Sequence, residues 1–420
     1  MKYLVLAEKP DQAKKYAQAL GQAKNEKGAW KVKTDLLDGQ VTIVSAVGHL
    51  VEIKNPYQNY ENWDLANLPA FPEVFEYEVK ADKKKQFNLI KREVNQADCI
   101  IIGTDADREG ESIAYLILRL IPNALKKVKY RLWVNSLTDA GIIKAFKNLR
   151  PAQETRQYAE EAEARAKSDW LVGFNFSPWT SLKLQGMGYL GEKDKKFSVG
   201  RVQTPIVSLI VENDLGIDSF VPVPFWKIEL IDDSGTVFKN KVKFDTLEDA
   251  QKALNTLGGQ SVVQTIQSEN KAVSAPNLYH LTNLQSEMSK KYHFDSAYTL
   301  EVAQKLYQKG VTSYPRTDHK LITPNEFDYL VKHLDDYKQV LGIDADLPNT
   351  QPRKKYVQDK QMEHYAIIPT ENTADVGSLE GDEKTLYLEI LKRTLLMFAP
   401  DYRYQATEVI LDNNGQSFSA

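Results

Sequence analysis

A dense run of acidic residues follows a short apolar run in the first third of the chain. The segment "CIIIG" at 99–103 is typical of a buried strand, and "TDADREGE" at 104–111 follows it directly. Like charges at this spacing repel one another unless a positive group lies among them. The sequence therefore predicts a strand that gives way to a helix at a site where several carboxylates need a cationic partner.

Length and composition give the broad class of protein. A chain of 420 residues suggests two to four domains, and 42% hydrophobic residues are enough for real cores. No apolar run approaches a membrane span, and the apolar stretch at the N-terminus is too short for a signal peptide. The single cysteine, Cys99, excludes a disulfide framework and a cysteine-rich zinc module. We expect a soluble, cytoplasmic protein with no membrane contact.

The net charge of −3 and the sequence pI of about 6.2 give no global positive field for nucleic acid. Basic residues nevertheless cluster at 80–85, 126–131, 193–196 and 353–355. Each cluster by itself is typical of a solvated helix end or loop. Charge alone leaves open whether several of them line one channel.

The first part of the chain alternates strand and helix patterns. Strands are predicted at 2–7, 41–47, 99–103 and 131–135, with a helix up to Gly21 and another over 111–121. This alternation predicts a mainly parallel sheet covered on both faces by helices. The unit is expected to close near residues 149–151.

The rest of the chain changes pattern twice. A long polar helix is predicted over 154–172, followed by a Gly- and Lys-rich loop and a helix with Thr204 as N-cap and Pro205 as its first residue. Residues 225–266 have strand patterns around one short helix. Helices return from 276, one of them with Gly310 as its C-cap.

Three carboxylates follow strands of the predicted sheet. Glu8 comes after the first strand, and Asp105 and Asp107 come after the third. If these strands are neighbours, the three groups meet beyond the carboxyl ends of the strands. In an extended segment Glu109 projects to the same side as Asp105 and Asp107. Such oxygen ligands suit Mg²⁺.

Helix capping is the alternative explanation for this acidic run. Glu109 and Glu111 lie at a predicted helix N-terminus, where the backbone dipole favours acidic side chains. That explanation accounts well for these two residues and poorly for Asp105 and Asp107. We therefore prefer a metal site.

The segment "TSYPRTD" at 312–318 is the second unusual stretch. Pro315 disfavours helical geometry at Tyr314, so Tyr314 and Arg316 are expected to face the same way. The functional interpretation is a nucleophilic tyrosine with a guanidinium beside it that stabilises a phosphate. The structural alternative is a turn in which Arg316 pairs with Asp318.

Two further segments carry candidate residues. "SVGRVQTP" at 198–205 places Arg201 and Gln203 near a helix N-terminus, where a phosphate can bind. "EHYAIIPT" at 363–370 places His364 before an apolar run. A lone histidine is more often a structural hydrogen-bonding group than a catalytic one.

In combination and in order, these segments resemble the type IA DNA topoisomerases, and among them bacterial topoisomerase III. The resemblance rests on Glu8 and Lys9 after the first strand, "TDADREGE", "SVGRVQTP", "SYPRTD" and "HYAIIPT", and covers nearly the whole chain. The acidic motif alone is less specific, since the same Toprim module occurs in primases and some nucleases. The tyrosine motif separates these classes.

The resemblance implies a multidomain α/β plus α+β fold of toroidal architecture. Residues 1–150 would form the Toprim domain, 151–215 the first helical segment of the single-strand channel, and 216–275 the first segment of a strand-rich arch. Residues 276–405 would form the helical lid that carries the tyrosine, and 406–420 the return to the arch.

The resemblance also implies roles for residues. Tyr314 would attack one DNA strand and become linked to a 5′-phosphate, without ATP, before strand passage and religation. Glu8 would give a proton to the departing 3′-oxygen, Lys9 and Arg316 would contact the phosphate, and His364 would help position it. The implied Mg²⁺ ligands are Glu8, Asp105, Asp107 and Glu109. The implied DNA contacts are Ser198, Val199, Gly200, Arg201, Val202, Gln203 and Arg316.

Two departures from the family pattern affect these expectations. Pro178 stands where the family usually has an arginine, which puts one phosphate contact in doubt. The chain also stops at Ala420, before the expected fold returns through the arch. The expected substrate is single-stranded DNA and the expected state a monomer. The alternatives are a fragment that binds single strands without full relaxation, and a Toprim nuclease or primase.

Overall fold

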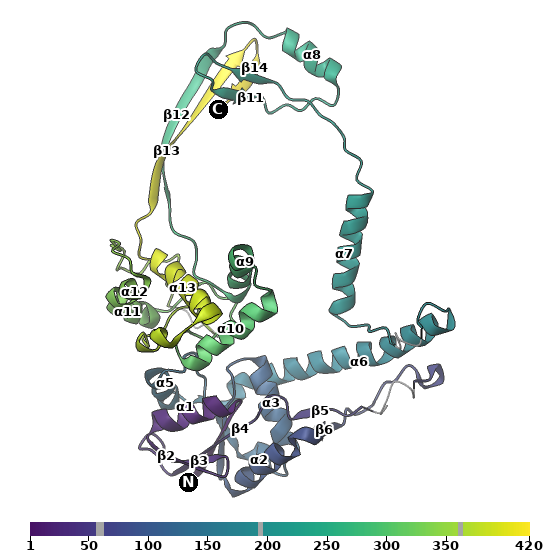
Figure 1. Cartoon of the computed structure of the whole chain (residues 1–420), viewed down its shortest axis with the longest axis vertical. Helices are drawn as coiled ribbons and strands as arrows, with labels where there is room; N and C mark the ends of the chain where they lie inside the picture. The colour runs from purple at the N-terminus through teal and green to yellow at the C-terminus, as the bar shows by residue number, and fades with distance from the viewer. Residues whose placement is uncertain (56–62, 192–195, 360–363) are drawn as a thin grey trace. The chain divides into compact units, whose positions relative to one another are not determined.

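The computed structural model describes residues 1–55, 63–191, 196–359 and 364–420. It forms two compact units (Figure 1). The first unit contains residues 1–206 and 276–398, and the second contains residues 207–275 and 399–420. Most of the basic cluster at 193–196 lies outside the described residues.

A seven-stranded sheet forms the centre of the N-terminal part of the first unit. Its strand order is β2-β3-β4-β1-β7-β8-β9. The four central strands, β4, β1, β7 and β8, are parallel. The strands β2, β3 and β9 pair in antiparallel fashion at the edges. The strands are β1 (Lys2–Ala7), β2 (Gln22–Glu26), β3 (Ala29–Lys33), β4 (Gln40–Ser45), β7 (Cys99–Gly103), β8 (Val128–Arg131) and β9 (Arg150–Pro151).

The sheet is covered on both faces, as the sequence predicts. In β1, Leu4 and Leu6 face one apolar cluster while Val5 and Ala7 face another, because successive side chains of a strand point to opposite faces. The first cluster contains residues of α2 (Lys84–Gln96) and α3 (Arg108–Arg119). The second contains residues of α1 (Pro10–Leu20) and α5 (Asp139–Lys147).

Several sequence expectations for this sheet need correction. The sheet is parallel only at its centre, and the β2–β3 hairpin at its edge was not anticipated. The strand expected at 131–135 lies at 128–131 instead. β7 ends at Gly103, so the segment after Leu132 has no strand beside it. It contacts the C-terminal half of the first unit instead: the Val134 carbonyl accepts a hydrogen bond from the Tyr307 hydroxyl.

One helix is much longer than predicted. α6 (Arg156–Gly186) includes 31 residues and continues through Pro178, where the sequence indicates an end near 172. Around Pro178, the hydroxyls of Ser177 and Ser181 exchange hydrogen bonds with the backbone of Val199 and Phe197. Short elements complete this part: α4 (Ala124–Lys127), β5 (Val51–Ile53) and β6 (Tyr77–Val79).

The C-terminal half of the first unit is a helical bundle with its own apolar core. Gly310 ends α10 in the left-handed conformation with φ of 79°, which confirms the expected C-cap. The bundle's helices are α9 (Leu281–Tyr292), α10 (Ser296–Lys309), α11 (Pro324–Lys332), α12 (Leu334–Leu341) and α13 (Gly381–Leu396).

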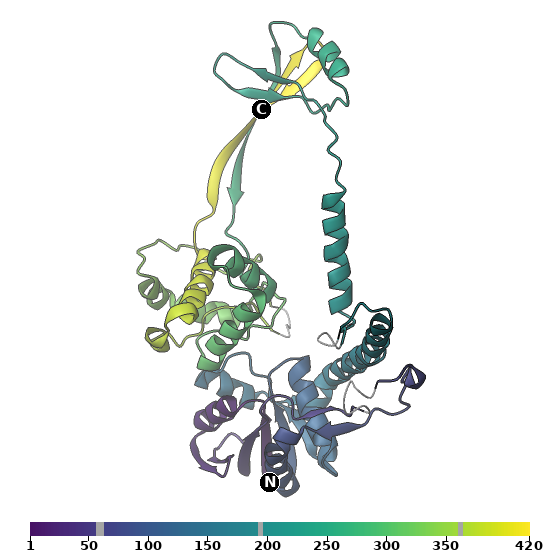
Figure 2. The ribbon, with the colours of Figure 1, turned by 45° about the vertical axis from the view of Figure 1, so that its right-hand side comes forward.

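The second unit is built on a five-stranded antiparallel sheet with the order β10-β11-β14-β13-β12. Figure 2 shows the long ribbon of β12 (Val262–Val273) and β13 (Tyr402–Asn413). The remaining elements are β10 (Glu229–Ile231), β11 (Val237–Lys239), α8 (Leu247–Asn255) and β14 (Gln416–Ser419). Strands around one short helix are what the sequence predicts for 225–266.

The helix that leads out of the first unit starts earlier than expected. α7 (Gln203–Asp218) includes Thr204 in its first turn, so Thr204 is not its N-cap. The Thr204 N–H donates to the Gly200 carbonyl at 3.1 Å, which extends the turn toward the N-terminus. None of the helices in the described ranges has the length and hydropathy needed to span a bilayer.

A fully buried guanidinium fixes the loop that follows β7. Arg131, at the end of β8, pairs with the buried carboxylate of Glu111 on α3. Its Nη atoms donate to the carbonyls of Thr104 at 2.9 Å and of Asp105 at 2.6 Å. A buried charge is tolerated only when it is paired and hydrogen-bonded, so this pair holds the loop and α3 to the sheet.

We predict that Glu111→Gln destabilises the first unit by about 3–5 kcal/mol, because it leaves the buried Arg131 charge without its partner. The measurement is urea unfolding followed by tryptophan fluorescence, to which Trp133 contributes with its ring 4.9 Å from the Arg131 guanidinium. The control is Lys54→Ala, which breaks the exposed Lys54–Glu76 pair and should not move the midpoint. Equal midpoints for the two variants would contradict the structural role of Arg131.

Candidate active site

The carboxyl ends of β1 and β7 bring Glu8 and Asp105 together. The two strands are parallel neighbours, with Ala7 opposite Gly103, as the sequence analysis required. The Asp105 N–H donates to Glu8 Oε2 at 3.2 Å. Lys9 Nζ lies 2.9 Å from Asp105 Oδ2 and 3.3 Å from Glu8 Oε1. The cationic partner that the acidic run needs is therefore Lys9.

Gln12 is part of this cluster, and the sequence analysis did not single it out. Its Nε2 donates to Asp105 Oδ1 at 2.9 Å, and its Oε1 accepts from the Glu8 N–H at 2.8 Å. Gln12 lies on the first turn of α1, four residues after Glu8, and is buried. The signal available in the sequence was a polar residue at a position where the helix faces the sheet.

Burial shapes the electrostatics of the cluster. It raises the pKa of Glu8 to about 7, and the neighbouring Asp105 carboxylate acts in the same direction. Burial alone would lower the pKa of Lys9, but Asp105 and Glu8 outweigh it and the pKa is raised. Lys9 is therefore a cation at neutral pH, while Glu8 is partly protonated.

The Tyr314 side chain lies beside Asp107. Its hydroxyl donates to Asp107 Oδ2 at 2.6 Å, and Arg316 Nη1 lies 3.4 Å from the same oxygen. Tyr314 and Arg316 therefore face the same way, as predicted, and Arg316 pairs with Asp107 rather than with Asp318. Tyr314 is 1% exposed. Burial and then the Asp107 charge hold its pKa well above the usual value.

His364 lies against the Tyr314 ring, with the two ring centroids 4.7 Å apart. Its Nδ1 is 2.8 Å from Asn135 Oδ1, and its ring stacks on Trp133 at 5.6 Å. Burial lowers the pKa of His364 to about 4, although the backbone of Ala106 and the charge of Asp107 act in the opposite direction. The ring is therefore neutral at pH 7.

Two predicted side chains have other contacts. Asp107 is the N-cap of α3, with Oδ1 accepting from the Gly110 N–H at 2.7 Å, so helix capping accounts for part of the acidic run after all. Glu109 lies inside α3 rather than in an extended segment. It pairs with His49 at 2.7 Å and Arg165 at 3.5 Å, and the hydrogen bond with His49 lowers its pKa. Glu109 nevertheless lines a cavity together with Asp107 and Arg316.

The predicted phosphate-binding segment lies beside α6. Arg201 Nε donates to Asp169 Oδ1 on α6 at 2.8 Å, and both side chains are partly exposed. The backbone of Val199 is held by Ser177, and Gln203 begins α7. The remaining predicted contacts, Ser198, Gly200 and Val202, belong to the same segment, which is largely exposed.

A cavity of about 280 Å³ lies beside the tyrosine, and its lining includes Asp107, Arg316 and His364. The structure therefore brings Asp107, Arg316 and His364 to one cavity, and the buried Tyr314 contacts this group through Asp107 and the His364 ring. Glu8, Lys9 and Asp105 lie at the adjacent strand ends. Within the described ranges, no three His, Cys, Asp or Glu side chains are grouped to hold a metal ion.

Comparisons with known proteins identify the family of the chain. A family model described as DNA topoisomerase matches residues 153–420, and the Toprim domain model matches residues 3–137. The chain belongs to the DNA topoisomerase family. The sequence-based resemblance to type IA topoisomerases, and to bacterial topoisomerase III among them, is thereby confirmed.

The family's curated members include close matches over the whole chain. DNA topoisomerase 3 of Bacillus subtilis is 34% identical over 438 residues, which cover 100% of this chain and 58% of the relative. DNA topoisomerase 1 of Alkalihalophilus pseudofirmus is 32% identical, covering 97% of this chain and 60% of that protein. The chain thus spans about three fifths of the length of these topoisomerases.

A solved structure supports the mixed α/β fold. Full-length topoisomerase I from Thermotoga maritima has a TM-score of 0.67 at 24% identity. The match covers 99% of this topoisomerase chain and 64% of the solved one.

We predict that Gln12→Ala lowers the free energy of unfolding by about 1–3 kcal/mol, since it leaves the buried Glu8 N–H and one Asp105 oxygen without a partner. Urea unfolding of the first unit measures this. Gln12→Glu keeps the acceptor for Glu8 but sets a third carboxylate against the pair, so it should destabilise at least as much at pH 8. A Gln12→Glu protein as stable as the unaltered chain would contradict this account of the cluster.

Proposed function

We propose that this chain cuts and rejoins one strand of DNA as a type IA topoisomerase, with Tyr314 as the nucleophile. The observation that carries the proposal is the Tyr314 hydroxyl, 2.6 Å from an Asp107 oxygen that Arg316 also approaches. This pairing places a nucleophile beside a proton acceptor and a phosphate-binding cation. A module that only binds DNA has no need of a buried tyrosine in such a setting.

In the proposed step, the Tyr314 oxygen forms a bond to a backbone phosphorus as its proton moves toward Asp107. The bond from phosphorus to the 3′-oxygen breaks, and the 5′-phosphate stays on the tyrosine. The reverse attack by the 3′-hydroxyl restores the strand. The phosphodiester is exchanged rather than hydrolysed, so the step needs no ATP.

Glu8 is the proposed proton donor to the departing 3′-oxygen. Its raised pKa of about 7 keeps a substantial protonated fraction at neutral pH, where an ordinary glutamate is almost fully ionised. Lys9, 3.3 Å from Glu8, places a positive charge at the same strand end. Lys9 and Arg316 are proposed to stabilise the charge that develops on the phosphate.

The carboxylates at the carboxyl ends of β1 and β7 are the type of ligand that Mg²⁺ prefers. Glu8 and Asp105 are both buried, and burial together with the Asp105 charge raises the pKa of Glu8, an effect that a nearby cation relieves. Mg²⁺ is commonly held by one or two carboxylates together with water and phosphate, so it does not need a full protein cage. Glu8 and Asp105 would hold it. Asp107, which accepts from Tyr314, and Glu109, which pairs with His49, are the other members of the proposed ligand set. When bound, Mg²⁺ would orient the phosphate and neutralise its charge.

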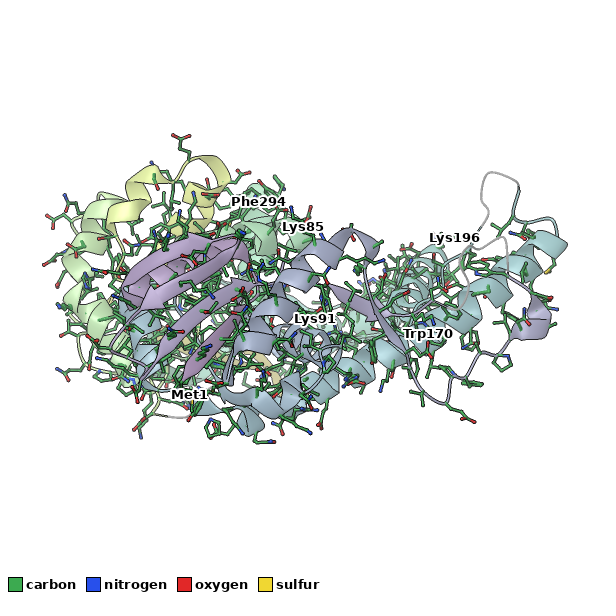
Figure 3. The ribbon with its side chains drawn as sticks, turned by 90° about the horizontal axis from the view of Figure 1, so that it is seen from below. Met1, Lys85, Lys91, Trp170, Lys196 and Phe294 are labelled. Carbon is green, nitrogen blue, oxygen red and sulfur yellow. The ribbon has the colours of Figure 1, made fainter. Side chains whose placement is uncertain are left out.

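Single-stranded DNA is the proposed substrate. Trp170 and Phe174 on α6 stack with centroids 4.3 Å apart, and Figure 3 labels Trp170 on this helix. A cavity of about 580 Å³ along α6 has a mainly apolar lining that includes Phe71, Phe176 and Trp179. Aromatic surfaces of this kind stack unpaired bases without strong sequence preference. Ser198 to Gln203, with Arg201 exposed, would contact the backbone.

The finer architecture belongs to this proposal. It comprises a Toprim domain at 1–150, channel segments at 151–215, an arch from 216–275 and 406–420, and a lid at 276–405, arranged as a torus around DNA. We also propose that the chain acts as a monomer.

The test is covalent capture of single-stranded DNA in the presence of Mg²⁺, with labelled DNA left on the protein after denaturation. We predict that Tyr314→Phe retains DNA binding within about twofold and forms no adduct, because only the nucleophilic oxygen is lost. The matched control is Tyr298→Phe, which removes the hydroxyl that donates to Asp382 on the bundle surface and should leave adduct yield unchanged. An undiminished adduct in Tyr314→Phe would end the proposal.

A further inference from the structure

Asn135 touches both the proposed nucleophile and His364. Its backbone carbonyl accepts a hydrogen bond from the Tyr314 N–H at 3.0 Å. Its side-chain oxygen lies 2.8 Å from His364 Nδ1, across a sequence separation of 229 residues. Asn135, in the segment that follows β8, therefore contacts both the segment that carries Tyr314 and the segment that carries His364.

Packing alone does not determine whether Nδ1 or Nε2 of the His364 ring faces Asn135. The ring lies between Trp133, at 5.6 Å and 19°, and Tyr314, at 4.7 Å and 37°. A half-turn of the imidazole about its Cβ–Cγ bond keeps the ring in nearly the same plane and preserves these contacts. The hydrogen bond to Asn135 distinguishes the two orientations.

That bond also determines the tautomer. An amide oxygen only accepts, so Nδ1 carries the proton and Nε2 has the lone pair in the neutral ring. In the part of the chain that the structure describes, Nε2 is buried and makes no hydrogen bond of acceptable geometry, although the Ala106 backbone lies near the ring and favours its protonated form. An amide oxygen also accepts from Nδ1 in the imidazolium. The bond therefore persists when Nε2 takes up a proton from solvent beside the negative charge of a phosphate and donates it in a hydrogen bond to a phosphate oxygen.

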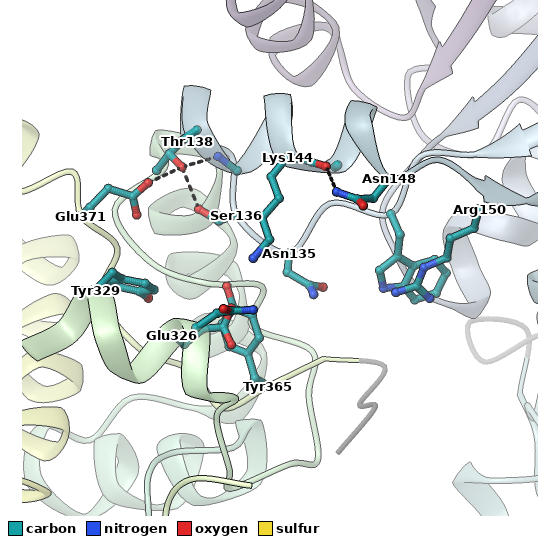
Figure 4. Close-up of a pocket in the computed structure, with 15 residues that line it drawn as sticks. Asn135, Ser136, Thr138, Lys144, Asn148, Arg150, Glu326, Tyr329, Tyr365 and Glu371 are labelled. Carbon is teal, nitrogen blue, oxygen red and sulfur yellow. Dashed lines mark hydrogen bonds between the residues drawn. The ribbon is translucent and has the colours of Figure 1, made fainter. Parts of the chain in front are cut away.

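The two residues line different cavities. His364 lines the cavity of about 280 Å³ that also contains Asp107 and Arg316. Asn135 lines a cavity of about 390 Å³ on α5, together with Lys144 and Glu326 (Figure 4). The hydrogen bond between Asn135 and His364 therefore connects the linings of the two cavities.

We propose that Asn135 is a positioning residue whose side-chain oxygen fixes the orientation and tautomer of His364, so that Nε2 is presented to the scissile phosphate beside Tyr314. This inference rests on the strand cleavage proposed above. Asn135 itself touches no reacting atom. Its effect on the reaction passes through the ring that it holds.

The first measurement is the tautomer itself, read from the side-chain ¹⁵N shifts of the histidines, with His364 assigned through His364→Gln. We expect an Nδ1-protonated ring in the unaltered chain. In Asn135→Ala this bias should be lost, so that the signal moves toward a mixture of the two tautomers. The chain has only six histidines, which keeps the spectrum simple.

The second measurement is the single-turnover rate of adduct formation on single-stranded DNA with Mg²⁺. Asn135→Ala should slow it by about 10–100-fold, as loss of a group that orients a functional histidine typically does, while DNA affinity stays within about twofold. Asn135→Asp keeps an acceptor at the same place and should recover most of the rate. The control is Asn148→Ala, which lines the same cavity and loses only a bond to the Lys144 carbonyl.

The two measurements separate the two claims. An unchanged His364 tautomer in Asn135→Ala, or an Asn135→Asp rate as low as that of Asn135→Ala, overturns the positioning role even if cleavage occurs. Failure of the unaltered chain to form any adduct overturns the proposed function, and the ¹⁵N result then decides alone whether Asn135 holds the ring.

Discussion

The buried Arg131–Glu111 pair holds the end of the sheet where the site is built. Arg131 has no solvent exposure, and its guanidinium is satisfied by one carboxylate and by backbone carbonyls at the end of β7. Removing a charge from water is costly, so the arrangement persists only while all these partners are in place. The backbone of Thr104 and Asp105 is fixed as a result. Asp105 can then meet Glu8 and Lys9 from the neighbouring strand.

The second requirement is contact between the sheet and the helical bundle that carries Tyr314. The Tyr314 hydroxyl donates a hydrogen bond to the Asp107 carboxylate, and the Tyr314 N–H donates to the Asn135 carbonyl. The hydroxyl of the neighbouring Tyr307 donates to the Val134 carbonyl. These are polar contacts with few atoms each, between segments far apart in the sequence. They place Tyr314, the proposed nucleophile, without a covalent link, so the site is complete only when the bundle contacts the sheet.

The sequence predicted the parts of the fold that depend on local patterns. The strands at 2–7 and 99–103, the covered sheet and the Gly310 cap followed from periodicity and turn chemistry. What failed depends on distant partners: Glu109 turns to His49 and Arg165, and the strand near 131 ends where β7 ends. Gln12, Asn135 and Arg131 were missed for the same reason. Each of them is ordinary in the sequence and becomes important through a contact with a residue far along the chain.

The most direct test of the central claim is to find where the DNA becomes attached. Single-stranded DNA is incubated with the protein and Mg²⁺, the mixture is denatured and treated with nuclease, and tryptic peptides are analysed by mass spectrometry. Cleavage after Lys309 and Arg316 releases the peptide 310–316, "GVTSYPR", which contains one tyrosine. The account predicts a nucleotide joined through its 5′-phosphate to Tyr314 in this peptide. A nucleotide on any other tyrosine, with 310–316 unmodified, would contradict it.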